Sequence, residues 1–337
     1  MQDRHLQIVR LLADGERRSG EDIAAELGIS RAAVWKAVQK AASRLGLVIE
    51  AERGRGYQLR RPLELLDAAA IAERIERPLR RRLAPIQVLD EIDSTNSLLL
   101  RQARDGAPCG QVCLAERQSA GRGRQGRHWV SPFGGNLYLS LLWRYALPPA
   151  ALGGLSLAAG VAVVKALTAA GAEDIGLKWP NDIHWRRRKL GGLLLEVAGE
   201  AEGPSQVVVG VGINLHLEPE QAAGIEQPWV DLGQIIGAAS VGRNALAAAL
   251  IQQLTVMLER YGQEGLGAFI DDWRLFDAYR GEPVELVQGV RRIIGINAGI
   301  DDDGALMLQR DGELMRFSAG ELSLRPITFA TAGAGRG

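Results

Sequence analysis

The beginning of the chain carries three apolar patterns at helical spacing. They read "RHLQIVRLLAD", then "GEDIAAELGI" after Ser19, and "RAAVWKAVQKAASRLG" after Ser30. A serine directly before such a run accepts hydrogen bonds from the amides of the first turn, and a glycine after the last apolar residue is typical of a helix end. We predict three short helices, with Gly15 ending the first and a tight turn around Gly28 joining the other two.

Two extended runs follow in "LVIEAERGRGYQLR", joined by Gly54-Arg55-Gly56, and they predict a β-hairpin. Three helices and a hairpin are the order of a winged helix-turn-helix, here over residues 1–62. From Arg31 to Arg61 eight lysines and arginines outnumber two acids, as a phosphate backbone requires. The alternative is a dimerisation or protein-docking module with solvated basic residues. We expect DNA contacts from Ser30, Arg31, Ala32, Trp35, Lys36, Arg53 and Arg55.

A central region, residues 63–279, begins with a short helical connector that is ended by Pro78 and Pro85. Apolar strand patterns alternate there with helices near Leu98, Leu155 and Leu250. Several strands follow one another without an intervening helix, so we predict an α+β layer: a mixed sheet with helices on one face, not a doubly wound sheet.

The pattern changes at the end of the chain to short alternating strands, interrupted by Asp303-Gly304 and Asp311-Gly312. Such dipeptides favour tight hairpin turns, and a small β-barrel over residues 280–328 is predicted. Residues 329–337 have the composition of a disordered tail.

Overall composition narrows the function classes. The formal net charge is zero, so binding to nucleic acid or membrane requires a local charge cluster. The first ten residues carry charges where a signal peptide is apolar, and the long apolar run around Lys165 suits a buried helix better than a membrane span. Cys109 and Cys113 are expected in one strand, without nearby histidine, so neither metal binding nor a disulfide framework is expected, and the cytoplasm is the expected location.

The stretch "GRGRQG", Gly121 to Gly126, fits the dinucleotide-binding pattern G-x-G-x-x-G letter by letter. That site needs a helix directly after the glycines and an acid about twenty residues later. Here "SPFGGN" breaks any helix, and no Asp or Glu stands between Glu116 and Glu173. The dinucleotide interpretation therefore fails.

What remains is a loop rich in glycine and arginine. Its glycines allow close approach of a ligand, and its arginines, without local carboxylates, favour an incoming anion. We expect it to close over a phosphorylated or adenylylated intermediate; the alternative is a solvated segment that touches nucleic acid nonspecifically.

Two further polar clusters stand at expected strand and helix ends. In "LKWPNDIHWRRRKLGGLLLE" Lys178 and Lys189 bracket Asn181-Asp182, which suits a phosphate or Mg²⁺. In "DSTNSLLL" the residues Ser94 to Asn96 precede an apolar helix. Taken alone, Asn181-Asp182 is also common in ordinary turns. Likewise, the residues Ser94 to Asn96 could simply cap the helix.

Taken together, "DSTN", "GRGRQGRHW", "KWPND" with "RKLGGLLLE", and "GVGINL" resemble the biotin protein ligases in order and spacing, specifically the bifunctional type that also represses the biotin operon. The resemblance covers nearly the whole chain. It implies a class II synthetase-like central sheet and an SH3-like C-terminal barrel. One position departs from the pattern, because His128 stands where relatives commonly have lysine, which makes one loop charge pH-dependent.

The resemblance also implies roles for individual residues. Residues expected to bind biotin are Ser94, Thr95, Asn96, Gln118, Arg122, Gly123, Arg124, Lys189, Gly192 and Leu194. Those expected around ATP or the adenylate are Arg124, Arg127, Trp129, Lys178, Asn181, Asn214 and Trp229. Arg122, Arg124, Lys178 and Lys189 are expected to serve catalysis, and Asp182 to meet Mg²⁺ that accompanies ATP.

The implied reaction converts biotin and ATP to biotinyl-5'-AMP and transfers the biotinyl group to a lysine of biotin carboxyl carrier protein, a subunit of acetyl-CoA carboxylase. The implied partners are this carrier, operator DNA and, with adenylate bound, a second copy of the chain; no membrane is implied. A rival from another class is a transcription regulator that senses a small acid without catalysis. A lipoate ligase shares the fold, but the "DSTN" and "GRGRQGRHW" clusters favour biotin.

Overall fold

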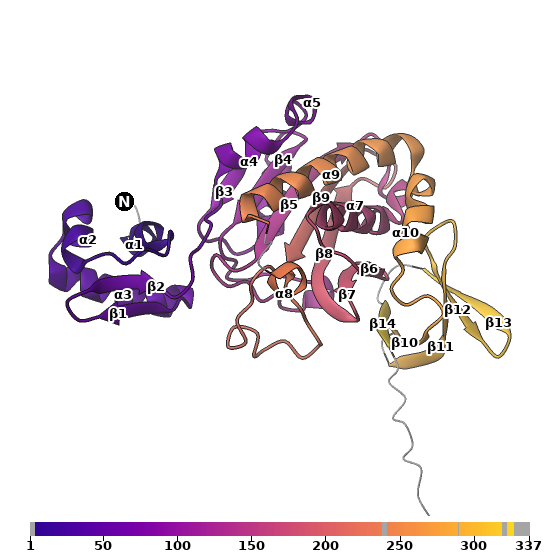
Figure 1. The fold of residues 1–337 in the computed structure, drawn as a ribbon. Coiled ribbons are helices and arrows are strands. Elements are labelled where there is room, and N and C mark those ends of the chain that lie inside the picture. The colour runs from indigo at the N-terminus through magenta and orange to yellow at the C-terminus, as the bar shows by residue number, and fades with distance from the viewer. Residues whose placement is uncertain (1–3, 238–240, 289, 319–321, 327–337) are drawn as a thin grey trace, which may run out of the picture.

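The computed structural model describes residues 4–237, 241–288, 290–318 and 322–326, so the expected tail at 329–337 lies outside the described residues. The N-terminal unit consists of α1 (Arg4–Leu12), α2 (Gly20–Leu27), α3 (Arg31–Leu45), β1 (Ile49–Glu52) and β2 (Gly56–Leu59) (Figure 1). Ser19 and Ser30 cap α2 and α3, and Gly28 ends α2 in the left-handed conformation. The predicted three helices and hairpin are confirmed.

Charged pairs connect this unit to the central region. Arg10 of α1 lies 2.7 Å from Asp90, and Arg44, in the last turn of α3, lies 3.0 Å from Glu91. Glu91 also receives Arg117 at 3.2 Å. Phe133 of the central region packs into the small apolar core of the winged helix. The two parts of the chain are thus joined by side chains as well as by the connector.

A seven-stranded mixed sheet forms the centre. Its strands are β3 (Gln87–Leu89), β4 (Gln111–Ala115), β5 (Leu137–Tyr145), β6 (Ile175–Lys178), β7 (Asp182–Trp185), β8 (Arg188–Gly199) and β9 (Ser205–Ile213). They lie in the order β3-β4-β5-β9-β8-β7-β6, and β3 pairs with β4 in parallel while the other neighbours are antiparallel. The predicted mixed sheet of an α+β fold is confirmed.

Helices cover both faces of the sheet, not one. α7 (Leu155–Ala169) and α9 (Arg243–Glu264) pack side by side on the face that carries the main core (Figure 1). α6 (Thr95–Arg104) lies on the other face, where Leu99 and Ala103 cover Cys113, Leu142 and Val208. Strand side chains alternate between the two faces of a sheet, so the apolar residues on this second face need a helix that shields them from water. The expectation of helices on one face is therefore wrong for α6.

Shorter helices complete the centre: α4 (Ala68–Arg74), α5 (Arg77–Arg80), α8 (Leu232–Ile236) and α10 (Ile270–Phe276). The stretch Pro149–Ala169 is the one helix of the described residues with the length and apolar composition of a membrane span, and two thirds of it is buried inside the protein. The interpretation as a buried helix is confirmed. Cys113 lies in β4, whereas Cys109 lies before it, and both are free thiols. Burial raises the pKa of Cys113 to about 12.

A polar cluster, here called the connector clamp, joins the buried side chains of Glu116, Arg243 and Asn244 to Glu64, which is exposed. Arg243 lies 2.7 Å from Glu116 and donates to the carbonyl oxygens of Glu64 and Asn136. Glu64 accepts from the backbone amide of Arg243 and from the Asn244 side chain. The clamp fixes the connector after the winged helix to the start of α9.

The C-terminal region is a five-stranded antiparallel sheet. Its strands are β10 (Pro283–Gln288), β11 (Arg291–Ile300), β12 (Leu306–Arg310), β13 (Glu313–Phe317) and β14 (Leu322–Pro326), in the order β13-β12-β11-β10-β14. Asp311 and Gly312 both have positive φ, at 52° and 84°, and join β12 to β13, so the predicted tight turn is confirmed. The Trp179 indole donates to the carbonyl oxygen of Gly304 and ties this sheet to the centre.

Candidate active site

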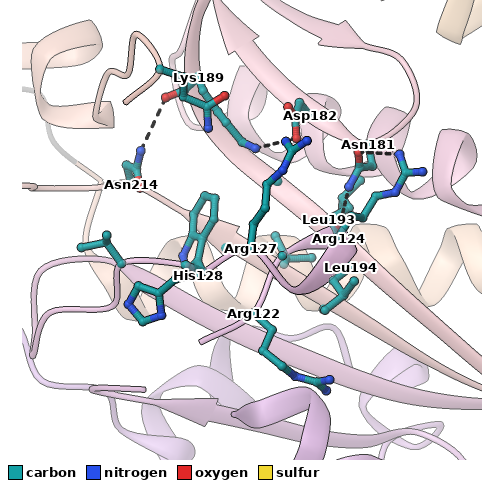
Figure 2. A pocket seen from close by; sticks show the side chains of 18 of the residues that line it. Arg122, Arg124, Arg127, His128, Asn181, Asp182, Lys189, Leu193, Leu194 and Asn214 are labelled. Carbon is teal, nitrogen blue, oxygen red and sulfur yellow. Dashed lines mark hydrogen bonds and ion pairs between the residues drawn. The ribbon is translucent and has the colours of Figure 1, made fainter. Parts of the chain in front are cut away.

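One cavity of about 730 Å³ opens in the central region. Its walls come from the N-terminus of α6, the glycine- and arginine-rich loop, the turn between β6 and β7, the strands β8 and β9, and the segment 224–229. Figure 2 shows residues from the loop, the β6–β7 turn and β8 around this space. Every residue expected to bind biotin, ATP or Mg²⁺ lines this cavity. Segments far apart in the sequence are therefore brought to one place.

Hydrogen bonds link Ser94, Thr95 and Gln118 at one end of the cavity. Ser94 caps α6, accepting from the Ser97 amide. The backbone amide and hydroxyl of Thr95 donate to Gln118 Oε1 at 2.9 and 3.1 Å, and Gln118 Nε2 donates to Ser131 at 3.3 Å. This end can offer oriented neutral donors and acceptors to a polar ring.

Asn96 is held differently from its neighbours. Its amide nitrogen donates to the Leu194 carbonyl at 3.0 Å and to Glu196 at 2.9 Å, while Oδ1 accepts from Ser140 at 2.6 Å. Each N–H of this amide thus has a protein acceptor. In this arrangement the Asn96 side chain stabilises the cavity wall through its three protein partners.

Arg122 has a partner that the sequence analysis did not single out. Its guanidinium donates to Ser97 and to both oxygens of Glu196, at 3.0 to 3.3 Å. The loop has no carboxylate near it in sequence, as expected, but the fold supplies a distant one to Arg122. Glu196 lies 74 positions away on β8, and only the sheet register brings it near, so no local signal pointed to it.

Arg124 and Arg127 extend in the opposite direction to Arg122, toward the β6–β7 turn (Figure 2). The loop makes one short turn at Arg124–Gly126, with Gln125 at a positive φ of 57°. Arg124 donates to Asn181 Oδ1 at 3.4 Å, and burial lowers the pKa of its guanidinium. The loop thus carries two cations into the cavity.

Lys189 and Asp182 form an ion pair in the cavity, with 2.7 Å between Nζ and Oδ1. Their side chains are only 13% and 17% exposed. Burial opposes the charge on Asp182, but Lys189, His184 and Lys178 outweigh it and hold the pKa of this carboxyl below its usual range. The lysine backbone is fixed too, because Lys189 N donates to the Pro228 carbonyl and Val230 N to the Lys189 carbonyl.

Trp129, Asn214 and Trp229 line the same cavity, on the adenylate side that the resemblance implies. The Trp129 ring lies 5.6 Å from Lys189 Nζ, and a side chain at Gly212 would approach this ring to 2.7 Å. Asn214 donates to the Val230 carbonyl at 3.2 Å. A glycine at position 212 is therefore required by the indole.

Replacing Gly212 with alanine should push the Trp129 ring from its place. Overpacking of this kind costs about 1–3 kcal/mol, so we expect the KM for ATP to rise about tenfold. The KM for biotin should change less, because Ser94, Thr95 and Gln118 lie at the other end. Steady-state kinetics measures both; Gly267→Ala, whose added methyl meets nothing within 4 Å, is the control. An unchanged KM for ATP would contradict the role of Trp129.

The seven residues expected to contact DNA are all exposed on α3 and the hairpin. Trp35 is 54% exposed and is not part of the core. However, the excess of basic residues counted in the sequence overstates the positive charge that is available to DNA, because two of these arginines are engaged elsewhere. Arg44 faces Glu91, and Arg61 lies part-buried beside His216 and Asp231.

Comparisons with known proteins place these features in a family. Residues 88–214 match the biotin/lipoate A/B protein ligase family, residues 4–58 an HTH domain and residues 280–325 the biotin protein ligase C-terminal domain. The bifunctional ligase/repressor BirA of Escherichia coli is 40% identical over 320 residues, covering 95% of this chain and 97% of that protein. The chain belongs to the biotin protein ligase family.

Two further relatives support the assignment of this chain to the biotin protein ligase family. The biotin–[acetyl-CoA-carboxylase] ligase of Mycobacterium tuberculosis is 36% identical over 70% of this chain and 88% of its own length. The structure of the biotin protein ligase from Aquifex aeolicus in complex with biotin and ATP matches with a TM-score of 0.61 and 28% identity, over 72% of this chain and 99% of that one. The predicted combination of ligase and repressor is confirmed by the match to bifunctional relatives along nearly the whole chain.

Proposed function

We propose that this biotin protein ligase activates biotin with ATP and transfers the biotinyl group to a lysine of biotin carboxyl carrier protein. One observation carries the proposal: a single cavity joins a neutral hydrogen-bonding end to a cationic end. Ser94, Thr95 and Gln118 suit the ureido ring, and Arg124, Lys178 and Lys189 suit carboxylate and phosphate. Gly192 and Leu194 provide the wall between them.

In the first step a biotin carboxylate oxygen attacks the α-phosphorus of ATP. The new bond forms biotinyl-5'-AMP, and the bond to pyrophosphate breaks. Two anions must approach each other, so neutralising charge is needed. Arg124, Arg127, Lys178 and Lys189 supply it, and the Asp182 ion pair keeps the Lys189 ammonium group in place.

Mg²⁺ is proposed to enter with ATP. No cluster of three or more His, Cys, Asp or Glu that could hold a metal is found among residues 4–237, 241–288, 290–318 and 322–326. Mg²⁺ often uses only one or two carboxylates together with substrate phosphates, and the buried, ionised Asp182 fits that requirement. The ion would neutralise phosphate charge when bound.

In the second step the amine of a carrier lysine attacks the acyl carbon of the mixed anhydride. An amide forms, AMP leaves with the bonding electron pair, and the amine loses a proton. The loop that carries Arg124 and Arg127 would exclude water, which would otherwise hydrolyse the anhydride.

Biotin-dependent exchange of labelled pyrophosphate into ATP tests the first step directly. We expect exchange only when biotin is present. A purified, folded protein without exchange would support the rival function of a non-catalytic regulator.

Arg124→Gly should leave adenylation active but release the intermediate early. The change removes a contact between the loop and Asn181, and a hydrogen bond to a charged group contributes about 1.5–3 kcal/mol. We therefore expect dissociation of biotinyl-5'-AMP to accelerate at least about tenfold, measured by rapid dilution of the loaded protein. Arg53→Gly, in the exposed hairpin, is the control. Unchanged retention of the intermediate would refute the role of the loop.

The repressor function is proposed to depend on a homodimer that places two winged helices on operator DNA in the cytoplasm. Bound adenylate would favour this dimer, and the carrier protein would compete for the same surface. We expect biotin with ATP to lower the dimer dissociation constant about 5- to 150-fold. Sedimentation at several protein concentrations measures it, and no change with ligand would reject the switch.

A further inference from the structure

His184 is a buried polar residue of the cavity that neither the sequence motifs nor the reaction steps above use. It lies on β7, two residues after Asp182, and is only 4% exposed. Its Nδ1 lies 2.9 Å from the Tyr279 hydroxyl, and the two rings meet edge to face, with centroids 5.6 Å apart. Nε2 has no hydrogen-bond partner among the described residues and lies 3.9 Å from Asp182 Oδ2.

The surroundings determine which nitrogen carries the proton. A neutral imidazole has one donor and one acceptor nitrogen. The ionised Asp182 carboxylate only accepts, so the arrangement with N–H on Nε2 is favoured. Tyr279 then donates its hydroxyl proton to Nδ1. The tyrosine therefore orients the ring and fixes its tautomer, as second partners of functional histidines commonly do.

Each oxygen of Asp182 thus has a different neighbour. Oδ1 is held by Lys189 at 2.7 Å, and Oδ2 faces His184. The distance of 3.9 Å exceeds a hydrogen bond, so His184 acts on Asp182 by electrostatic attraction and by occupying the buried space next to it. Without the imidazole the carboxylate could rotate away from the cationic end of the cavity.

Tyr279 is itself fixed by the start of the C-terminal region. Its backbone amide donates to Asp277 Oδ1 at 3.0 Å, and Asn297 of β11 donates to the same carboxylate. The Ala278 amide donates to the Leu177 carbonyl at the edge of β6. A continuous set of contacts thus runs from the C-terminal sheet through Tyr279 and His184 to Asp182.

We infer that Tyr279 and His184 form a positioning pair that holds Asp182 for adenylation, so that docking of the C-terminal sheet completes the phosphate end of the cavity. The inference rests on the proposed adenylation. It assigns the pair to the first step, because Asp182 lies among the lysines and arginines that would surround the triphosphate. Transfer from biotinyl-5'-AMP, after pyrophosphate has left, should depend on it little.

The experiment measures the two steps separately in the full-length protein. Biotin-dependent pyrophosphate exchange reports adenylation, and biotinylation of a carrier protein from supplied biotinyl-5'-AMP reports transfer. Loss of an outer partner commonly costs about 10- to 100-fold in activity. We expect Tyr279→Phe to slow exchange about tenfold and His184→Phe about 100-fold with a raised KM for ATP. Transfer should stay within about twofold of wild type, because Asp182 is not needed there.

Two variants separate positioning from general structure. Tyr145→Phe removes another buried tyrosine hydrogen bond, to the Leu258 carbonyl at 2.9 Å, away from the cavity, and should change neither step. His184→Gln restores a donor amide and should recover part of the exchange that His184→Phe loses. If His184→Phe does not fold, Tyr279→Phe and His184→Gln carry the test.

Three results would overturn the inference: unchanged exchange in Tyr279→Phe, equal loss of exchange and transfer in both pair variants, or an equal effect of Tyr145→Phe. If wild-type protein transfers biotin from supplied biotinyl-5'-AMP but shows no exchange, the proposed adenylation is wrong. The inference, which rests on it, then falls as well. The two failures are therefore distinguishable.

Discussion

Replacing Lys189 with alanine is expected to lower the rate of biotin-dependent pyrophosphate exchange by about 10³-fold, the upper range for loss of one preorganised charge-stabilising donor. The substitution removes a cation from the phosphate end and also leaves Asp182 without its 2.7 Å partner. An unpaired carboxylate in a mostly buried position opposes the approach of a second anion. The rate of exchange at saturating biotin and ATP measures the effect.

Lys165→Ala is the matched control. Lys165 pairs with Asp272 at 2.6 Å on the exposed surface, so its removal should leave exchange unchanged within about twofold, since surface pairs contribute about 0–1 kcal/mol. A loss below tenfold in Lys189→Ala would show that Arg124, Arg127 and Lys178 suffice, and the assigned role of Lys189 would be wrong.

Arg243→Met is expected to lower the free energy of unfolding by about 3–5 kcal/mol, as removal of one partner from a buried ion pair typically does. Arg243 is 4% exposed and Glu116 is 2% exposed. Methionine fills much of the volume but donates nothing, so Glu116 and the carbonyls of Glu64 and Asn136 lose donors together. Urea denaturation followed by circular dichroism measures the loss.

The control for the connector clamp is Arg260→Met on the same helix. Arg260 pairs with Glu264 at 3.0 Å with about half of each side chain exposed, and such a helix pair contributes only about 0.3–0.5 kcal/mol. Adding Glu116→Gln to Arg243→Met removes the stranded charge and should recover part of the stability. A loss under about 1 kcal/mol in Arg243→Met would mean that water compensates the clamp.

Local patterns in the sequence predicted the elements well. Ser19, Ser30 and Gly28 fix helix ends through their own backbone and side-chain geometry, and the strand patterns of the centre reappear as β3 to β9. The residues that line the cavity could be predicted because they stand in short contiguous motifs. "GRGRQG" and "KWPND" each carry several residues of the cavity wall.

Contacts between distant segments could not be predicted in the same way. Glu196 reaches Arg122 across 74 positions, and Tyr279 reaches His184 across 95. Glu196 reaches Arg122 through its place in β8, and Tyr279, which lies outside the strands, reaches His184 because its segment packs against β6. Both contacts form only in the assembled protein. The position of α6 on the second face could not be predicted either. The run Gln111–Ala115 is buried at every position and so needs cover on both faces, but the strand pattern does not say which helix provides it.

The acidic residues Asp90 and Glu91 receive arginines from α1 and α3 directly before the segment that begins at Ser94. A ligase fragment that lacks the winged helix would expose two adjacent carboxylates that have lost two of their three arginine partners and keep only Arg117. The affinity of such a fragment for biotin would therefore reflect the altered charge near Ser94 as well as the loss of the winged helix. Added salt weakens partly exposed pairs of this kind, so the mutual orientation of the two halves should loosen as ionic strength rises.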